Sequence, residues 1–200
     1  MNLNIVISGP SGAGKGTLIS EILKNKNFLK AVSCTTRDMR IGEVNKLDYD
    51  FISLKEFKDK LKKNEFFEAV EYDGNYYGIL NEYLNITDKH KVFDIVVSSG
   101  INLKKKYPDN TLLIYILPVN LETLNKQRGN RGINRLDIGK KELELVKNYD
   151  YLIINDTKEN MLYQFEQILT VTLYNTIKNQ QSFLDNFYQS PKQLLKCLVT

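Results

Sequence analysis

The sequence predicts a three-layer α/β fold with a mostly parallel central sheet. Short apolar runs rich in β-branched residues recur along the chain, and segments with helical spacing of apolar residues separate them. Strands of this kind are buried on both faces, which requires a parallel sheet covered by helices on either side. The chain has 200 residues, of which 42% are hydrophobic. We therefore expect one domain with small insertions.

The first strand, loop and helix are predicted at the N-terminus. The apolar run 4–8 is expected to be a strand, and a glycine-rich loop connects it to a helix over 17–24. That helix places Leu18, Ile22 and Leu23 on one face, which would pack on the sheet.

Later strands and helices continue the alternation. Apolar, β-branched runs predict three more strands, at 92–97, 112–117 and 151–154. Apolar residues at helical spacing predict two more helices, one carrying Leu54, Phe57 and Leu61, the other carrying Met161, Phe165, Ile168 and Thr172. Alternating strands and helices are typical of a parallel sheet.

Two segments interrupt this alternation. Residues 33–80 are dense in tyrosine, phenylalanine, glycine and charge, and they predict a small β-rich insertion. Residues 128–135, RGNRGINR, lack apolar periodicity and predict a mobile basic loop. The core domain should then comprise 1–32, 81–127 and 136–200. Apolar residues within 180–200 are expected to dock on the body or on a second subunit.

The charge pattern favours a small anionic ligand. The chain has 28 basic and 24 acidic residues, a formal net charge of +4, and its charges are spread out with only brief clusters such as 104–106. Nucleic-acid-binding proteins usually concentrate basic residues in one patch. We therefore expect no nucleic-acid partner.

Cysteine usage and the lengths of the apolar runs indicate a cytoplasmic protein. Cys34 and Cys197 are far apart and form no Cys-x-x-Cys pair, which argues against a disulfide framework and a structural zinc site. The longest apolar run, 112–117, is far shorter than the roughly 20 residues of a membrane span. The first strand begins too close to Met1 for a signal peptide. We expect a reducing environment and no membrane partner.

The stretch GPSGAGKGT, between the first strand and the first helix, predicts a phosphate-binding loop. Its glycines let backbone N–H groups turn into one concavity, which the positive end of the helix dipole faces. Lys15 can reach the outer phosphates, and the hydroxyl of Thr17 can assist phosphate or metal binding. A glycine-rich turn without a ligand is the alternative. The strand before the motif and the helix after it favour a nucleotide.

A second anion site is predicted in the insertion. Arg37 and Arg40 are three residues apart, and Tyr49 follows them. Guanidinium groups match phosphate oxygens bidentately and a phenol adds a neutral donor, so the three could hold a phosphomonoester. Such an arginine pair alone is usually a solvated surface feature. Beside a phosphate loop it favours a site for two nucleotides.

The order of these motifs resembles that of the guanylate kinases. GPSGAGKGT, TTR-x-x-R-x-GEVN-x-x-DY, FFE and GNYYG occur in that family's order and approximate spacing, over about residues 4–170. Gly16 stands where many phosphate loops carry Ser or Thr, but Gly-Lys-Gly-Thr is familiar among nucleoside monophosphate kinases. The resemblance implies a P-loop fold, with 33–80 as a GMP-binding insertion and 128–135 as a short lid.

The resemblance also implies a role for each matching residue. Those implied to bind ATP are Gly9, Pro10, Ser11, Gly12, Ala13, Gly14, Lys15, Gly16, Thr17, Arg128 and Asn155. Those implied to bind GMP are Ser33, Arg37, Arg40, Tyr49, Glu68 and Tyr77, of which Glu68 would read guanine. The implied catalytic residues are Lys15, Arg37, Arg131 and Arg135. Thr17 and Asp94 would hold Mg²⁺.

Two positions depart from the family's pattern. The family usually has a second carboxylate where this chain has Val96, and a hydroxyl side chain that touches guanine where it has Ile79. One contact with the base is therefore missing from the implied set, which leaves a relaxed base preference open.

The implied activity is the phosphorylation of GMP, and of dGMP, to GDP by ATP and Mg²⁺, in a monomer or homodimer. One alternative is a catalytically weakened binding module, as in the guanylate-kinase-like domains of membrane-associated scaffold proteins, whose phosphate loop is degraded. Another is a kinase of relaxed base preference. The intact Lys15 favours the enzyme. Glu68 disfavours AMP, because adenine lacks the paired N–H donors that a carboxylate accepts.

Overall fold

The computed structural model describes residues 2–72, 74–118 and 144–178, with side chains as far as residue 173. The basic loop 128–135 and its arginines Arg128, Arg131 and Arg135 lie outside the described residues, as do residues 180–200 with Cys197. The described elements are β1 (Asn4–Ser8), α1 (Lys15–Ile22), β2 (Phe28–Ala31), β3 (Cys34–Thr35), β4 (Asp50–Phe51), α2 (Leu54–Lys62), β5 (Phe66–Tyr72), β6 (Asn75–Leu80), η1 (Asn81–Asn85), β7 (His90–Asp94), α3 (Val97–Lys106), β8 (Thr111–Pro118), β9 (Tyr151–Asn155) and α6 (Lys158–Lys178).

The central sheet has five strands in the order β2-β7-β1-β8-β9, and every pair is parallel. This confirms the predicted α/β fold with a parallel sheet. The apolar pattern did not predict β2, which is four residues long and lies at the edge of the sheet. Its sequence, FLKA, is too short a run to stand out, and an edge strand is buried less completely than a central one.

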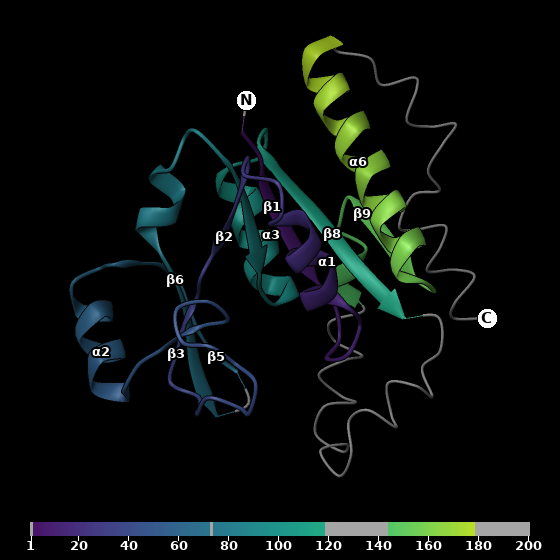
Figure 1. The fold of residues 1–200 in the computed structure, drawn as a ribbon. Coiled ribbons are helices and arrows are strands. Elements are labelled where there is room, and N and C mark those ends of the chain that lie inside the picture. Colours follow the sequence, from purple (N-terminus) through teal and green to yellow (C-terminus); the bar gives the residue numbers. More distant parts are fainter. Residues whose placement is uncertain (1, 73, 119–143, 179–200) are drawn as a thin grey trace.

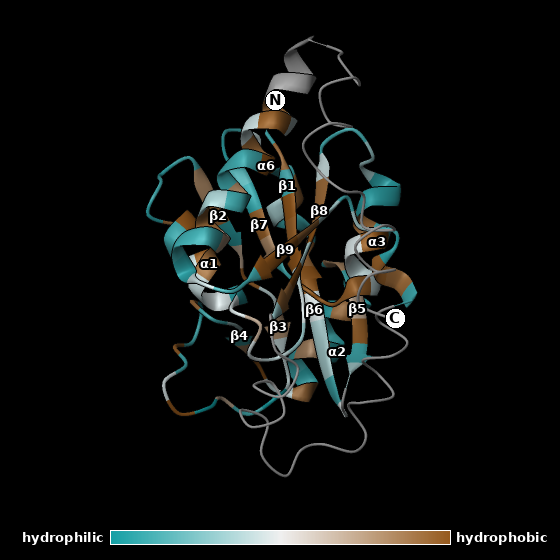
Figure 2. Ribbon diagram, turned by 90° about the vertical axis from the view of Figure 1, so that its right-hand side faces the viewer, coloured by the Kyte–Doolittle hydropathy of each residue, from teal (hydrophilic) through white to brown (hydrophobic). Residues whose placement is uncertain are grey.

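The sheet is covered on both faces, which makes three layers (Figure 1). Side chains alternate along a strand, so Ile5 and Ile7 of β1 pack with α1 and α6, whereas Val6 packs with α3. Figure 2 shows the central strands as the most hydrophobic part of the ribbon. Burial on both faces explains why these strands read as continuous apolar runs.

Several element bounds differ from the predicted ones, and two of them matter for the site. Helix α1 begins at Lys15, so the phosphate loop leads directly into it. The predicted strand 92–97 was wrong at its end, because β7 stops at Asp94 and Val97 is the first residue of α3. Val97 is 1% exposed and packs in the core with Val6 and Phe93. An apolar run can therefore continue across a strand, a short turn and the start of a helix.

The insertion forms a second sheet of four strands in the order β4-β3-β6-β5. The strands β5 and β6 make an antiparallel hairpin, and β3 pairs antiparallel with β6. Ile79 of β6 is buried in the same apolar cluster as Val6 and Phe93 of the central sheet. The two sheets therefore share part of one core, and in Figure 1 the second sheet lies beside the lower part of the first.

Helix α2 belongs to this insertion. It begins with a capping box, in which the Ser53 hydroxyl accepts from the backbone N–H of Glu56 and the Glu56 carboxylate accepts from the backbone N–H of Ser53. Of the predicted apolar face only Phe57 is buried, because Leu54 and Leu61 are 45% and 49% exposed. Phe57 stacks on Phe66 with ring centroids 4.5 Å apart.

No helix among the described residues is long and apolar enough to cross a membrane. Cys34 is a buried free thiol. Burial and the adjacent carboxylate of Asp50 raise the pKa of Cys34 to about 12, so the group stays protonated around neutral pH.

We predict that Phe57→Ala destabilises the protein by about 3–5 kcal/mol, because it empties a fully buried aromatic position. The matched control is Leu61→Ala on the same helix, which should change stability by less than about 0.5 kcal/mol since Leu61 is largely solvated. Urea unfolding measures both. Equal losses for the two variants would contradict the observed packing of α2.

Candidate active site

The phosphate loop lies at the carboxyl end of β1, in the middle of the central sheet. Three of its glycines have positive φ angles: Gly9 at 153°, Gly12 at 84° and Gly14 at 96°. A Cβ on Gly9 would lie 2.6 Å from the carbonyl oxygen of Ile116 in the neighbouring strand β8. Only glycine, which has no Cβ, can lie this close to the backbone of β8. The close contact between the two backbones therefore requires glycine at position 9.

The loop leads directly into α1, so the first N–H groups of that helix face the loop. Gly14 is the N-cap, and no side chain of the described residues caps these donors. A helix start that lacks a side-chain cap offers N–H groups and a positive dipole end to an anion. Nζ of Lys15 donates to the carbonyl oxygens of Gly9 and Pro10, at 2.7 and 3.3 Å. The lysine therefore folds back over the loop that carries it.

Asn155, at the end of β9, holds the loop from the other side. Its side-chain amide donates to the carbonyl oxygen of Ala13 at 2.9 Å. A Cβ on Gly14 would collide with this amide and come within 3.5 Å of the sulfur of Met161. Asn155 thus lies against the loop, and its predicted place near the ATP base stays a prediction.

The second predicted anion site centres on Arg37. Its guanidinium donates to both carboxylate oxygens of Glu43, at 3.0 and 2.7 Å, and the pair is largely buried. Glu43 also accepts from the backbone N–H of Arg40 at 2.7 Å. Burial opposes both charges, but the pair's own hydrogen bonds prevail: they raise the pKa of Arg37 and lower that of Glu43. Both groups are therefore charged at neutral pH, and the Arg40 side chain is exposed beside them.

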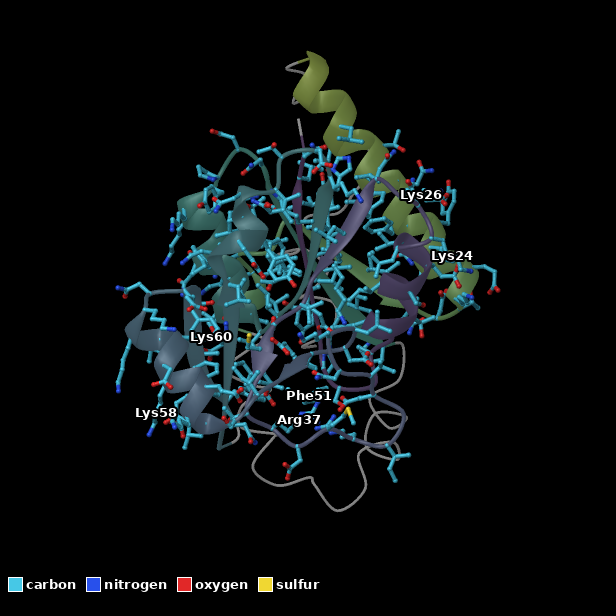
Figure 3. All side chains as sticks on the ribbon, turned by 60° about the vertical axis from the view of Figure 1, so that its left-hand side comes forward. Lys24, Lys26, Arg37, Phe51, Lys58 and Lys60 are labelled. Atoms are coloured by element: carbon cyan, nitrogen blue, oxygen red, sulfur yellow. The ribbon has the colours of Figure 1, made fainter. Side chains whose placement is uncertain are left out.

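Aromatic rings surround this ion pair. The Arg37 guanidinium lies over the rings of Tyr49 and Phe51, 5.5 and 5.4 Å from their centroids. Figure 3 labels Arg37 and Phe51, which lie close together in the insertion. The ring of Tyr77 lies edge to face with that of Tyr49 at 6.0 Å. Burial, followed by the negative charge of Asp94, raises the pKa of Tyr49 above its ordinary value. Tyr49 therefore keeps its proton and can donate to a phosphate oxygen.

Asp94 connects the two sites. It is half-buried at the carboxyl end of β7, where it pairs with Ile7 of β1, two residues before the phosphate loop. Its charge acts on Tyr49, which belongs to the insertion. Asp94 therefore lies at the end of the strand beside β1, near the phosphate loop, and its charge reaches Tyr49 of the arginine-tyrosine site. Thr17 is exposed in the first turn of α1.

The predicted base-binding residues lie on strands or at their ends. Ser33 is 7% exposed, just before β3. Glu68, on β5, accepts from the side-chain amide of Asn102 on α3 at 2.6 Å, through Oε1. Its other oxygen, Oε2, is buried and has no hydrogen-bond partner among the described residues. Ile79 lies opposite Glu68 in the strand register and packs in the core. Val96 is the N-cap of α3.

Sequence reasoning missed three residues that hold this site together. Glu43 was visible within the GEVN motif but carried no assigned role, and it is the partner of Arg37. Asn102 is a helix residue whose contact with Glu68 joins positions 34 residues apart. Lys30, on the edge strand β2, donates to the carbonyl oxygens of Leu47 and Asp48, just before Tyr49. No sequence signal marks the last two, because both contacts depend on the tertiary fold.

Comparison with known proteins agrees with this geometry. The family model described as guanylate kinase matches residues 1–172. The chain belongs to the guanylate kinase family. Curated guanylate kinases from Clostridium tetani and Clostridium acetobutylicum are 37% and 34% identical to it, over 84% and 92% of this chain and 85% and 92% of theirs. A guanylate kinase from Bartonella henselae is 38% identical, over 89% of this chain and 83% of its own.

The fold of a solved guanylate kinase is similar as well. The crystal structure of the enzyme from Anaplasma phagocytophilum superposes with a TM-score of 0.73 at 26% identity, and the match covers 85% of each chain. Family membership and fold are thus established for this protein. The roles of its individual site residues remain predictions that the geometry described above supports.

We predict opposite outcomes for two alanine substitutions in the phosphate loop. Gly14→Ala should cost about 2 kcal/mol or more, because it combines a left-handed backbone with a collision against Asn155. Gly16→Ala should be neutral or stabilising by up to about 1 kcal/mol, since nothing lies within 4 Å of its Cβ position and the residue is helical. Urea unfolding measures both, and a stable Gly14→Ala protein would contradict the loop geometry.

Proposed function

We propose that this protein transfers the terminal phosphoryl group of ATP to GMP, forming ADP and GDP. The observation that carries the proposal is the pairing of two anion sites. A phosphate loop with Lys15 lies at the end of β1, and the Arg37 and Tyr49 site lies within electrostatic reach of Asp94 at the end of the adjacent β7. A phosphoryl transfer between two nucleotides needs two such sites on one side of the sheet.

The reaction demands positioning more than acid–base chemistry. The attacking oxygen belongs to the phosphate of GMP and is already anionic, so no strong general base is needed. The protein must bring two negatively charged groups together and stabilise the charge that spreads in the transition state. Among the described side chains, Lys15 and Arg37 offer positively charged donors for this task, and Tyr49 offers a neutral one.

We assign the ATP phosphates to the loop. The N–H groups at the start of α1 and Nζ of Lys15 would bind them, and Lys15 would exchange its present contacts with Gly9 and Pro10 for phosphate oxygens. Arg37, Arg40, Tyr49 and Tyr77 would bind the phosphate of GMP. Glu43 keeps Arg37 charged and oriented before the substrate arrives. In this assignment the predicted lid, 128–135, adds Arg131 and Arg135 at the transferring group and Arg128 at ATP, and it excludes water.

Glu68 is the proposed reader of guanine, together with Ser33. Guanine presents two adjacent donors, the ring N1–H and the exocyclic amine, and a carboxylate accepts from both. The unsatisfied oxygen Oε2 of Glu68 supports this role, because a buried carboxylate oxygen without a partner is costly unless a ligand supplies one. Adenine has no such pair of donors on the same edge.

The donor set near the phosphate loop fits Mg²⁺. A half-buried carboxylate, Asp94, and a hydroxyl, Thr17, are hard oxygen donors of the kind this ion prefers, and it usually binds through one or two such groups, phosphates and water. No cluster of three or more metal-binding side chains occurs among the described residues, which agrees with an ion held largely by its substrate. Bound Mg²⁺ neutralises phosphate charge.

The organisation proposed from this function has three parts. Residues 1–32, 81–127 and 136–200 form the core that binds ATP, 33–80 bind GMP, and 128–135 close over both. We place the protein in the cytoplasm as a monomer or homodimer that acts on small molecules, without nucleic-acid or membrane partners.

The decisive test is an assay of GMP, dGMP, AMP, CMP, UMP and IMP as acceptors with ATP and Mg²⁺, in which GMP should be preferred. Lys15→Ala should lower GDP formation by at least about a hundredfold and leave unfolding unchanged, because it removes charge from the transferring phosphates. Lys26→Ala, an exposed lysine after α1, is the matched control and should keep full activity. Wild-type protein that binds nucleotides but phosphorylates none would favour the binding-module alternative.

We expect Glu68→Ala to erode the preference for GMP over AMP. Losing both acceptors should cost about tenfold or more in kcat/KM for GMP, with little change for AMP. Glu71→Ala, an exposed carboxylate on the same strand, is the control and should leave the preference intact. An unchanged ratio of kcat/KM values in Glu68→Ala would remove Glu68 from base recognition.

A further inference from the structure

We infer that Asn102 of α3 is a positioning residue for guanine recognition, which fixes the carboxylate of Glu68 so that its second oxygen stays turned toward the base. The inference rests on the proposed function, because it concerns the base of the same acceptor nucleotide. Its starting point is the 2.6 Å hydrogen bond between the two side chains.

The chemistry of the contact determines its direction. A carboxylate only accepts hydrogen bonds, so the NH₂ end of Asn102 must face Oε1 of Glu68. This leaves Oε2, which is buried and has no partner among the described residues. The pair therefore has one oxygen fixed by the protein and one buried oxygen available to a ligand.

A β-bulge aims Glu68 at α3. The register of β5 against β6 shifts between Phe66 and Glu68, so Phe67 is an extra residue that interrupts the alternation of side chains. Phe67 also reaches α3, because Nζ of Lys106 lies 4.7 Å from its ring centroid. Two consecutive residues of β5 thus contact the same helix, one turn apart, and Glu68 is held against a rigid element.

The residue across the strand cannot take over this role. Ile79 is opposite Glu68 in the register, has no hydrogen-bonding side chain and is 4% exposed in the core. Glu68 therefore needs a donor from another element, and α3 supplies it.

A neutral donor suits a carboxylate that must still bind a ligand. Each carboxylate oxygen has two lone pairs, so Oε1 can keep Asn102 while accepting a second donor from guanine. An amide orients the group without cancelling its charge, whereas a lysine or arginine at this position would form an ion pair that competes with the base. Exposure of Asn102 on the helix surface makes the residue replaceable without opening the core.

The test compares Asn102→Leu with the wild type in steady-state kinetics. We expect KM for GMP to rise about tenfold, with kcat and KM for ATP within twofold, because only the acceptor base is affected. The ratio of kcat/KM for GMP over AMP should fall by a similar factor. Lys105→Ala, an exposed residue on the same helix, is the matched control and should change neither value.

A double-mutant cycle separates positioning from a general effect on folding. In a Glu68→Ala background, Asn102→Leu should have almost no further effect on KM for GMP, because the carboxylate that Asn102 orients is gone. Asn102→Asp keeps the side-chain shape but removes the donor, and it should raise KM for GMP at least as much as Asn102→Leu. It also serves as the test variant should Asn102→Leu fold poorly.

Two failures can be distinguished. A wild-type protein that does not phosphorylate GMP overturns the proposed function. A wild-type protein that phosphorylates GMP, with Asn102→Leu and Asn102→Asp both within twofold of it in KM for GMP and in the GMP-to-AMP ratio, overturns the role of Asn102 alone. Additive effects in the double-mutant cycle would also overturn it.

Discussion

The site depends on the turn by which β1 passes into α1. As the central strand, β1 is hydrogen-bonded to β7 and β8, so its carboxyl end is held on both sides. Gly9 lies close to the backbone of Ile116, and Gly14 lies close to the side-chain amide of Asn155. The first N–H groups of α1 are then aimed at one point. The proposed binding of phosphate at this point would depend mainly on backbone geometry, to which Lys15 adds charge.

The insertion prepares its recognition groups in a different way, through side-chain partners from elsewhere. Glu43 fixes Arg37 and the backbone at Arg40, and Asn102 fixes Glu68. Glu43 does this through an ion pair, and Asn102 does it through a neutral donor. Preorganisation of this kind lowers the entropic cost of binding, since the side chains are already ordered before the nucleotide arrives.

Sequence periodicity predicted the central strands well because they are buried on both faces and their apolar runs are continuous. It was less successful where the burial of a residue depends on which other helix or strand packs against it. Leu54 and Leu61 match a helical apolar face, yet both are about half exposed, because Phe57 is the residue of α2 that is buried against the second sheet. The edge strand β2 was missed because its apolar run is only four residues long and includes Lys30.

The sequence by itself determined the layered α/β fold, the glycine-rich loop and the residue types of both proposed anion sites. Each follows from local pattern: apolar runs, glycine spacing, and arginine and tyrosine within a short motif. The tertiary structure decided which partners hold those groups. The contacts of Asn155 with Ala13, of Lys30 with the backbone before Tyr49, and of Asn102 with Glu68 join residues far apart in the chain. Such contacts exist only after the sheet and its helices have packed, so no local pattern records them.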